Sequence, residues 1–527
     1  MAAVLDLTEL TPSQLKQLEE LVITPGVNPK YASSKNFWAK ESAEQKRKEA
    51  TVPCYQICGN KIILPFNLAN RLGQRWVNKN LVKPDGSFQF TAHLLPHQVP
   101  IAEQAKAILG SQRSVILKLY TSFGKTALAA YLHSQLGGLA LILLPSTTLI
   151  DQWAKTYQQF TNAIYTIVDP PSSGGFKWIQ GSRTIICMES RIDAIPPTFL
   201  SAVKILILDE SHQLCTRSGT AAMLKPGLQP LYVIACSASF YRKDQAHTLI
   251  EEVCGKGNMI ALKSDKPFRV YCYNTMIPLK LVERYGQLDW HTYCNAINNN
   301  RYRNWAMVQW ILQNLYQQVN GQTVRVHKMM ILTWHVKHGT LLEIILSKYG
   351  IKVDTMMGSK KNYNDSDVLI GTFAKIGTGF DEKMSCDDFD NIRIDVLLMG
   401  SSMKDKYLLE QVAGRVFRSE WPSIVYFRDY GFLADSHWKM AQSWFASRKG
   451  TVIESNGGFT PQQLYYQWQQ VEAYIVSTLP PGLTLNDFGD TELGNLLSDP
   501  VEVVKEKKQT NEQQINSMFK QIGPLLG

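Results

Sequence analysis

The segment VILKLYTSFGKTALAAYL (115–132) decides the fold class, because it joins a strand signal directly to a helix signal. The continuous apolar run at 115–117 predicts a buried strand, and the alanine- and leucine-rich run at 127–132 predicts a helix. Similar apolar runs, separated by helical stretches, recur near 139–144, 184–187, 204–208 and 231–236. Strands that alternate with helices require a parallel sheet, so the sequence predicts an α/β protein.

The loop between these two elements has the residues of a phosphate-binding site. Gly124 lets the backbone turn its N–H groups inward at the start of a helix, where the helix dipole attracts anions. Lys125 supplies a cation for the phosphates, and Thr126 supplies a hydroxyl for Mg²⁺. Ser122 is expected to contact the nucleotide as well. The first glycine of the usual pattern is Leu119 in this chain, and an ordinary helix start is the structural alternative.

A pair of carboxylates follows a second buried strand. The run ILIL (205–208) predicts a central strand that delivers Asp209 and Glu210 to the carboxyl edge of the sheet, where open α/β sheets bind ligands. Asp209 is expected to hold Mg²⁺, and Glu210 to orient and deprotonate the water that attacks ATP. An acidic helix cap after a core strand is the structural alternative.

The string QVAGRVFR (411–418) contains two arginines three residues apart, which predicts that both lie on one face of a helix. Arginines that reach a γ-phosphate stabilise the negative charge that spreads over its oxygens during hydrolysis. Arg415 and Arg418 are expected to have this role, and Gln411 to touch the nucleotide or the water. The neighbouring apolar residues argue against a fully exposed basic face, and buried arginines require a partner anion.

These strings resemble the successive motifs of superfamily 2 helicases, in the order that this family uses. The resemblance is carried by LPHQ (95–98), TSFGKT (121–126), LPSTTLIDQW (144–153), DESH (209–212), SAS (237–239) and QVAGRVFR (411–418). The stretch VLIGTFAKIGTGFDEKMSC (368–386) is similar to the DExH translocases of large DNA viruses and phages, such as the poxvirus transcript-release helicase and phage branch-migration helicases. The resemblance implies two tandem RecA-like domains and an ATPase driven by nucleic acid.

The resemblance implies further nucleotide-binding residues by position. Gln98 matches the residue that contacts adenine, although His97 replaces the aromatic residue usually placed before it. Gly379 and Asp381 match residues that approach the nucleotide from the second domain.

Other matching positions belong to nucleic-acid binding and to coupling. Thr147, Thr148 and Thr372 match residues that contact the nucleic-acid backbone, with a helix cap or turn as the structural alternative. Ser237 and Ser239 match the motif that couples hydrolysis to strand movement, and Ser239 replaces the usual threonine while keeping its hydroxyl.

The motifs and turn signals divide the chain into five segments. We expect an N-terminal accessory region (1–90), an ATP-binding RecA-like domain (91–262), a helical connector (263–325), a second RecA-like domain (326–450) and a C-terminal extension (451–527). Near the N-terminus, Thr11, Pro12 and Gln14 predict a helix that begins with a capping box. In the connector, Trp305 and Trp310 either stack on bases or, as we expect, pack their helix against a domain.

The composition agrees with a polyanionic partner. The chain has 527 residues, of which 45% are hydrophobic, and a net charge of +10. Its nine cysteines include no Cys-x-x-Cys pair, so neither a disulfide framework nor a structural metal is expected. Without a basic targeting region or a long apolar run, the chain is expected to be soluble, with no membrane partner, in the host cytoplasm (viral factory), the nucleus or the virion.

The expected function is that of an ATP- and Mg²⁺-dependent DNA helicase or translocase in viral transcript release or in DNA recombination and repair. The expected partners are single-stranded or duplex DNA, RNA or an RNA–DNA hybrid, and transcription machinery. An RNA helicase in RNA processing is one alternative, because such motors mainly grip backbone phosphates. A non-catalytic scaffold subunit of a transcription complex is the other; Leu119 favours it, and intact Lys125, Glu210 and Arg418 argue against it.

Overall fold

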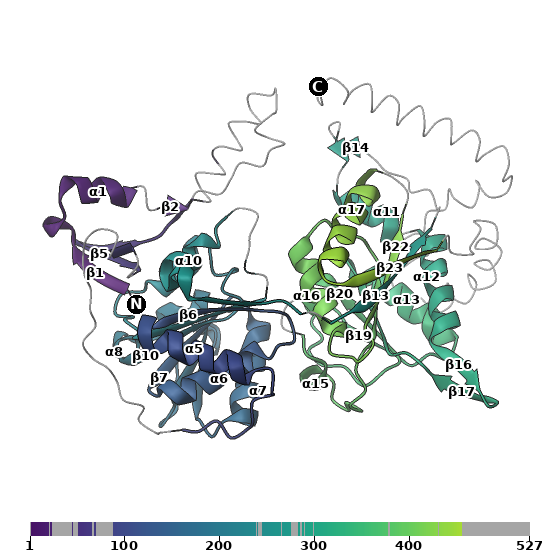
Figure 1. Cartoon of the computed structure of the whole chain (residues 1–527), viewed down its shortest axis with the longest axis horizontal. Coiled ribbons are helices and arrows are strands. Elements are labelled where there is room, and N and C mark those ends of the chain that lie inside the picture. Colours follow the sequence, from purple (N-terminus) through teal and green to yellow (C-terminus); the bar gives the residue numbers. More distant parts are fainter. Residues whose placement is uncertain are drawn as a thin grey trace. The chain divides into compact units, whose positions relative to one another are not determined.

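A computed structural model describes residues 2–19, 22–23, 45, 51–65, 68–69, 88–238, 240, 245–264, 266–275, 283–284, 287–288, 290–298, 300–377, 380–429 and 432–455. The chain forms two compact units, Met1–Ser264 and Asp265–Gly527 (Figure 1). Ser239, Gly379 and most of the expected C-terminal extension lie outside the described residues. Among the helices that the structure describes, none has the length and apolar character needed to cross a membrane.

The first unit contains a seven-stranded sheet whose neighbouring strands are all parallel (Figure 1). In spatial order the strands are β12 (Met259–Leu262), β6 (Ser114–Leu119), β11 (Tyr232–Ser237), β10 (Val203–Leu208), β7 (Leu139–Leu144), β9 (Thr184–Met188) and β8 (Tyr165–Ile167). The helices are α5 (Val99–Gln112), α6 (Lys125–Leu136), α7 (Thr147–Phe160), α8 (Pro197–Ala202), α9 (Arg217–Met223) and α10 (Thr248–Cys254).

Both faces of this sheet are buried. On β10, Ile205 and Ile207 belong to one hydrophobic core, and Leu206 and Leu208 belong to the core on the other face. Because helices cover both faces, the central strands are continuous apolar runs rather than alternating ones. The five strands predicted in this unit are confirmed as β6, β7, β9, β10 and β11. The sequence analysis missed β8 and β12, which are short strands at the two edges of the sheet.

The N-terminal region adds a small antiparallel sheet to the first unit. It consists of β1 (Ala2–Asp6), β5 (Lys61–Pro65) and β4 (Gln56–Cys58), beside helix α1 (Pro12–Glu19) and the short pair β2 (Val22–Ile23) and β3 (Val52–Pro53). The predicted capping box is confirmed, because the Thr11 N–H donates to Gln14 Oε1 at 2.9 Å and the Gln14 N–H donates to Thr11 Oγ1 at 3.3 Å. Leu64 of β5 lies in the same core as Leu249 of α10, so the small sheet packs on the large one.

The second unit is built around another seven-stranded, all-parallel sheet. In spatial order the strands are β19 (Val353–Met356), β20 (Val368–Thr372), β18 (Met329–Thr333), β21 (Val396–Met399), β22 (Ser423–Arg428), β13 (Phe268–Asn274) and β23 (Gly450–Ser455). The helices are α11 (Trp290–Asn298), α12 (Arg301–Asn314), α13 (Val336–Lys348), α14 (Phe373–Gly377), α15 (Glu382–Ser385), α16 (Lys406–Val416) and α17 (Phe432–Ser447). Two hairpins pair β14 (Glu283–Arg284) with β15 (Gln287–Leu288) and β16 (Tyr316–Val319) with β17 (Gln322–Arg325).

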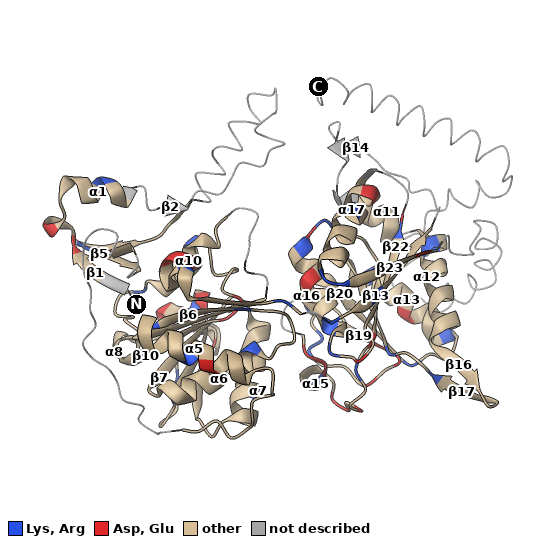
Figure 2. Cartoon of the chain, viewed as in Figure 1, with Lys and Arg blue, Asp and Glu red and all other residues tan. Residues whose placement is uncertain are grey.

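The composition of the strands explains how both sheets are buried. Strands β7 and β11 of the first sheet and β18 and β20 of the second contain no charged residue (Figure 2). With two parallel sheets covered by helices, the predicted fold class, two tandem RecA-like α/β domains, is confirmed.

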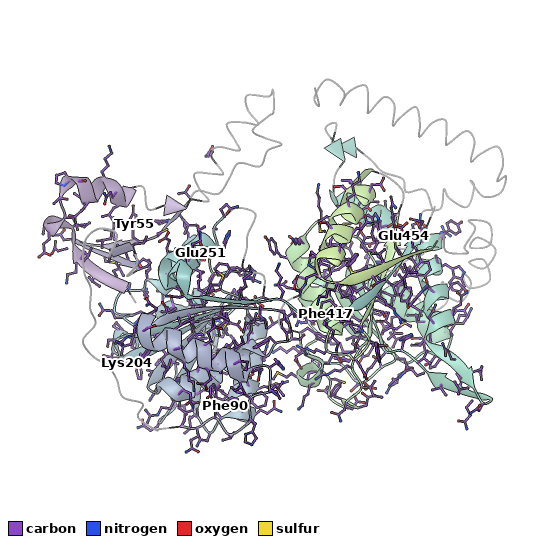
Figure 3. The ribbon with its side chains drawn as sticks, viewed as in Figure 1. Tyr55, Phe90, Lys204, Glu251, Phe417 and Glu454 are labelled. Carbon is purple, nitrogen blue, oxygen red and sulfur yellow. The ribbon has the colours of Figure 1, made fainter. Side chains whose placement is uncertain are left out.

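The predicted connector needs a correction. Strand β13 lies inside the second sheet between β22 and β23, so the sheet begins before residue 326 and extends past residue 450. Phe268 of this strand packs on Phe417, with ring centroids 4.9 Å apart, and both rings belong to one hydrophobic core of this unit. Figure 3 labels Phe417. Trp305 and Trp310 are buried in the same unit, which confirms that they pack α12 against the sheet.

A buried ion pair fastens α12 to the carboxyl edge of this sheet. Arg303 Nε donates to Asp429 Oδ1 at 2.6 Å, and neither side chain is exposed to solvent. Arg303 Nη1 also donates to the Gly400 carbonyl at 2.6 Å, and Thr275 Oγ1 donates to Asp429 at 3.2 Å. The pair therefore joins the first turn of α12 to the residues that follow β13, β21 and β22.

We expect Arg303→Ala to lower the free energy of unfolding by about 3–5 kcal/mol, because it leaves the Asp429 carboxylate buried without a compensating charge. The double variant Arg303→Ala/Asp429→Ala should be less destabilised than this single variant, since both charges are gone. Urea unfolding monitored by tryptophan fluorescence measures both effects. If Arg303→Ala lowered the free energy of unfolding by less than about 1 kcal/mol, the pair would contribute no more than an exposed surface ion pair does.

Candidate functional site

The loop that joins β6 to α6 has the backbone geometry of an anion-binding turn. Ser122 and Gly124 have positive φ angles of 76° and 88°, and α6 begins at the next residue, Lys125. A Cβ atom on Gly124 would lie 2.4 Å from Gln98 Nε2, so both the backbone and the available space require glycine here. Lys125 Nζ lies 3.3 Å from the Leu119 carbonyl, which folds the ammonium group back over the loop.

Leu119 occupies the position of the missing first glycine because it still belongs to the sheet. It pairs with Leu262 of β12 and is fully buried in the core. The Leu119 side chain therefore contributes to the core, and the turn of the loop begins only after this residue.

Gln98 braces this loop from the start of α5. Its side chain is 4% exposed, Oε1 accepts the Leu95 N–H at 2.9 Å, and Nε2 donates to the Phe123 carbonyl at 2.8 Å. The His97 ring also meets the Phe123 ring, with centroids 5.1 Å apart. The structure thus brings Gln98 to the phosphate loop, and its contact with adenine stays a prediction.

Asp209 lies directly after β10, as predicted, and both of its carboxylate oxygens accept hydrogen bonds. Oδ2 accepts the Trp153 indole N–H at 2.8 Å, and Oδ1 accepts the Glu210 N–H at 2.9 Å. Burial, and next the Glu210 carboxylate, raise the pKa of Asp209 to about 6, although Trp153 and Lys125 oppose this rise. The ionised carboxylate is therefore held in one orientation in a place that disfavours its charge.

Glu210 and the residues beside it link the two carboxylates to the end of β11. Glu210 has a φ of 43°, a strained value for a residue with a side chain, and its Oε2 is buried without a hydrogen-bond partner. His212 Nδ1 lies 2.8 Å from Ser237 Oγ and 3.6 Å from Glu210 Oε2. The DESH and SAS strings thus meet through His212 and Ser237.

These residues fit a nucleotide with its magnesium ion. Mg²⁺ in such sites takes one or two carboxylates together with substrate phosphates, so Asp209 and the Thr126 hydroxyl suffice on the protein side. Lys125 adds the cation for the phosphates. The buried Glu210 Oε2 accepts no hydrogen bond within the protein and is suited to accept a proton from a water molecule.

Two functional candidates were missed by the sequence analysis. Trp153 and Gln152 lie on α7, and the Gln152 amide donates to Thr126 Oγ1 at 3.3 Å. Trp153 is fully buried and resembles an ordinary core aromatic in the sequence, so only its indole N–H reveals its contact with Asp209. Thr147 and Thr148 are exposed at the N-terminus of the same helix.

In the second unit, the predicted arginines gather around the segment that follows β20. Arg415 is buried and donates to the carbonyls of Phe380 at 2.6 Å and Gly377 at 3.0 Å. These two backbone carbonyls are thus partners of the buried guanidinium group. Arg418 forms an ion pair with Asp381. Burial raises the pKa of Asp381, but Arg418, Arg393 and the Met384 N–H together outweigh this effect, so the pKa is lowered overall.

The predicted helix is shorter than expected. Helix α16 ends at Val416, so Arg418 lies beyond it, while Arg415 and Gln411 are buried within it. Thr372 is the last residue of β20 and is 7% exposed.

We expect Asp209→Asn to raise the free energy of unfolding at pH 7.5 by about 1–3 kcal/mol while it abolishes ATP hydrolysis. The folded state binds the Asp209 proton more tightly than the unfolded state does, so stability is lost as the pH rises from 3.8 to about 6, and the full cost is present above this range. The gain of the variant should therefore shrink toward pH 4. Urea unfolding at several pH values measures the difference, and a constant difference across this range would contradict the assignment.

Comparison with known proteins places these features in a family. The DEAD/DEAH box helicase family matches residues 99–246, which span the loop, both carboxylates and Ser237. The chain is 26% identical over 419 residues to the protein named "Putative helicase 161L" of Invertebrate iridescent virus 6, covering 75% of this chain and 89% of that one. It is 24% identical over 360 residues to the transcript termination protein A18 of Yaba-like disease virus, covering 65% and 72% of the two chains.

Among solved structures, S. cerevisiae Dbp5 bound to RNA and ADP BeF3 aligns with 72% of this chain and 93% of its own, at 14% identity and a TM-score of 0.47. The family match and the viral relatives agree with the order and geometry of the motifs. The chain therefore contains a DEAD/DEAH box helicase domain, the domain of an ATP-hydrolysing enzyme of superfamily 2.

Proposed function

We propose that this helicase translocates along DNA and displaces what lies ahead of it, above all a nascent transcript. The observation that carries the proposal is the similarity to a transcript termination protein, A18, over 65% of the chain. Its working partners are DNA, an RNA–DNA hybrid and the transcription machinery, and it acts wherever viral transcription takes place, in the cytoplasmic factory or the nucleus.

The first unit holds the nucleotide in this proposal. The backbone N–H groups of residues 122–126 surround the phosphates, and Lys125 neutralises part of their charge. Thr126 and Asp209 are the magnesium ligands, and bound Mg²⁺ supplies further neutralisation of the β- and γ-phosphate oxygens. Glu210 orients the attacking water through the carboxylate oxygen that accepts no hydrogen bond within the protein.

The second unit supplies the remaining charge. Arg418 exchanges its ion pair with Asp381 for the γ-phosphate, because phosphate is an equally good partner for the guanidinium group. Arg415 holds Gly377 and Phe380 through its contacts with their carbonyls. Gln411, Gly379 and Asp381 complete the nucleotide side of this unit.

Nucleic acid binds through backbone phosphates at the carboxyl edges of the two sheets. Thr147 and Thr148 are exposed at the N-terminus of α7, where backbone N–H groups favour an anion. In the second unit, Thr372 ends β20, and Lys375 and the exposed Lys337 follow β20 and its neighbour β18. The contact of His212 with Ser237 connects the hydrolytic carboxylates to the coupling motif, to which Ser239 also belongs.

We expect Arg418→Ala to leave nucleotide affinity nearly unchanged and to reduce polymer-stimulated turnover by about 10³–10⁵-fold, the range for arginines that stabilise a transferring phosphoryl group. Arg428→Ala is the matched control, because Arg428 forms a half-exposed surface ion pair with Asp435 in the same unit. Steady-state hydrolysis and equilibrium nucleotide binding separate the two effects. Equal losses of affinity and rate would make Arg418 a structural residue.

The proposed function is tested by assembling a stalled transcription complex, or an R-loop, on DNA and following release of the RNA. Wild-type protein with ATP should release the transcript, whereas Lys125→Ala should not, because it loses nucleotide binding. Glu210→Gln should bind ATP and also fail to release RNA, because only water activation is lost. Hydrolysis is measured in parallel at fixed salt with single-stranded DNA, duplex DNA and RNA, since phosphate contacts depend steeply on salt. Stimulation by RNA alone would favour the RNA-processing alternative.

A further inference from the structure

Helix α7 connects three parts of the first unit that the proposed mechanism treats separately. Its exposed N-terminus carries Thr147 and Thr148, the proposed contacts with nucleic acid. Five and six residues after Thr147, the side chains of Gln152 and Trp153 contact Thr126 and Asp209. One helix thus reaches from the nucleic-acid side to both proposed magnesium ligands, over about 7–9 Å along its axis.

The contact of Trp153 with Asp209 is specific in its chemistry. The indole N–H can only donate, and it lies 2.8 Å from Asp209 Oδ2 in a fully buried position. Asp209 Oδ1 is held separately by the Glu210 N–H, which belongs to the turn after β10. The orientation of the carboxylate therefore depends on two donors from two different elements, and only Trp153 belongs to the helix that faces nucleic acid.

Gln152 makes the corresponding contact with the other ligand. Its amide nitrogen donates to Thr126 Oγ1 at 3.3 Å. This hydrogen bond fixes the direction in which the Thr126 hydroxyl points. Because adjacent residues of one helix hold both ligands, a shift of α7 must move the carboxylate and the hydroxyl together.

The far end of the helix is fixed in the core. The Tyr157 hydroxyl lies 2.7 Å from His133 Nδ1 of α6, and the Trp153 and Tyr157 rings are 6.1 Å apart. Helix α7 is thus anchored where it packs on α6, while Thr147 and Thr148 of its first turn are exposed. A phosphate bound at that first turn acts on the same rigid element that holds the ligands.

We propose that Trp153 and Gln152 are positioning residues that set the geometry of the magnesium ligands and transmit the binding of nucleic acid at the start of α7 to the ATP site. This inference rests on the proposed roles of Asp209 and Thr126. It assigns α7 a mechanical task in addition to its contact with the nucleic-acid backbone, and it adds a route that is separate from the His212–Ser237 contact.

The test uses the full chain and measures binding of a fluorescent ADP analogue as Mg²⁺ is titrated, with an EDTA sample as the metal-free reference. Trp153→Phe keeps the aromatic ring and removes only the N–H. We expect the half-saturating Mg²⁺ concentration to rise about 10–100-fold, the usual effect of removing a partner that orients a metal ligand, with affinity in EDTA unchanged. The matched control is Tyr157→Phe, which removes a buried hydrogen bond from the same helix but contacts no proposed ligand. It should match the wild type.

The same titration with a single-stranded DNA oligonucleotide tests transmission. In the wild type, DNA should lower the half-saturating Mg²⁺ concentration, since coupling between two sites is reciprocal. In Trp153→Phe this effect of DNA should be lost. Gln152→Met should also reduce the effect of DNA on the half-saturating Mg²⁺ concentration. Because Gln152 is half-buried, this variant provides the test if Trp153→Phe fails to fold.

Three outcomes decide the matter. A rise with Trp153→Phe but not with Tyr157→Phe supports the inference. Identical Mg²⁺ dependence in these two variants, while Asp209→Asn loses the effect of Mg²⁺ on nucleotide affinity, overturns the inference and leaves the proposed function standing. An Asp209→Asn protein with normal Mg²⁺ dependence overturns the metal site itself, and with it the inference.

Discussion

A single carboxylate, that of Asp209, is held in one orientation deep inside the first unit by donors from two elements. Burial disfavours the charge of Asp209, so the protein surrounds the group with donors rather than removing it from the core. The donors come from α7 and from the turn after β10. That turn forces Glu210 into a left-handed conformation, which is tolerated because the surrounding strands hold its ends.

The nucleotide loop shows how a departure from a common pattern is absorbed by neighbouring structure. Leu119 continues β6 by one residue and pairs with the edge strand β12, so the sheet gains a contact where other loops of this kind begin to turn. Glycine is then needed at position 124, where φ is positive and where a Cβ atom would lie close to the Gln98 amide. Strand pairing and loop geometry are therefore coupled, and neither Leu119 nor Gly124 can be understood alone.

Local features of this protein could be predicted from the sequence, whereas features that depend on distant partners could not. The capping box at Thr11, the strand β10 and the placement of Asp209 follow from residues a few positions apart. Strand β13 was missed because it acquires its character from β22, which lies some 150 residues later in the chain. The same holds for the Trp153 indole, which looks like core packing until its partner 56 residues away is seen. Arg418, which follows the end of α16, likewise has a distant partner in the sequence, Asp381.

The position of β13 also determines how the protein can be cut. Because this strand hydrogen-bonds to β22 on one side and to β23 on the other, a recombinant fragment that starts at residue 326 would lack an interior strand of its own sheet. Strand β23 would lose its only neighbour in that sheet, and the edge of β22 would be open to pairing with other chains, which favours aggregation. An isolated second unit suitable for crystallisation or spectroscopy must therefore begin before Phe268 and continue through Ser455.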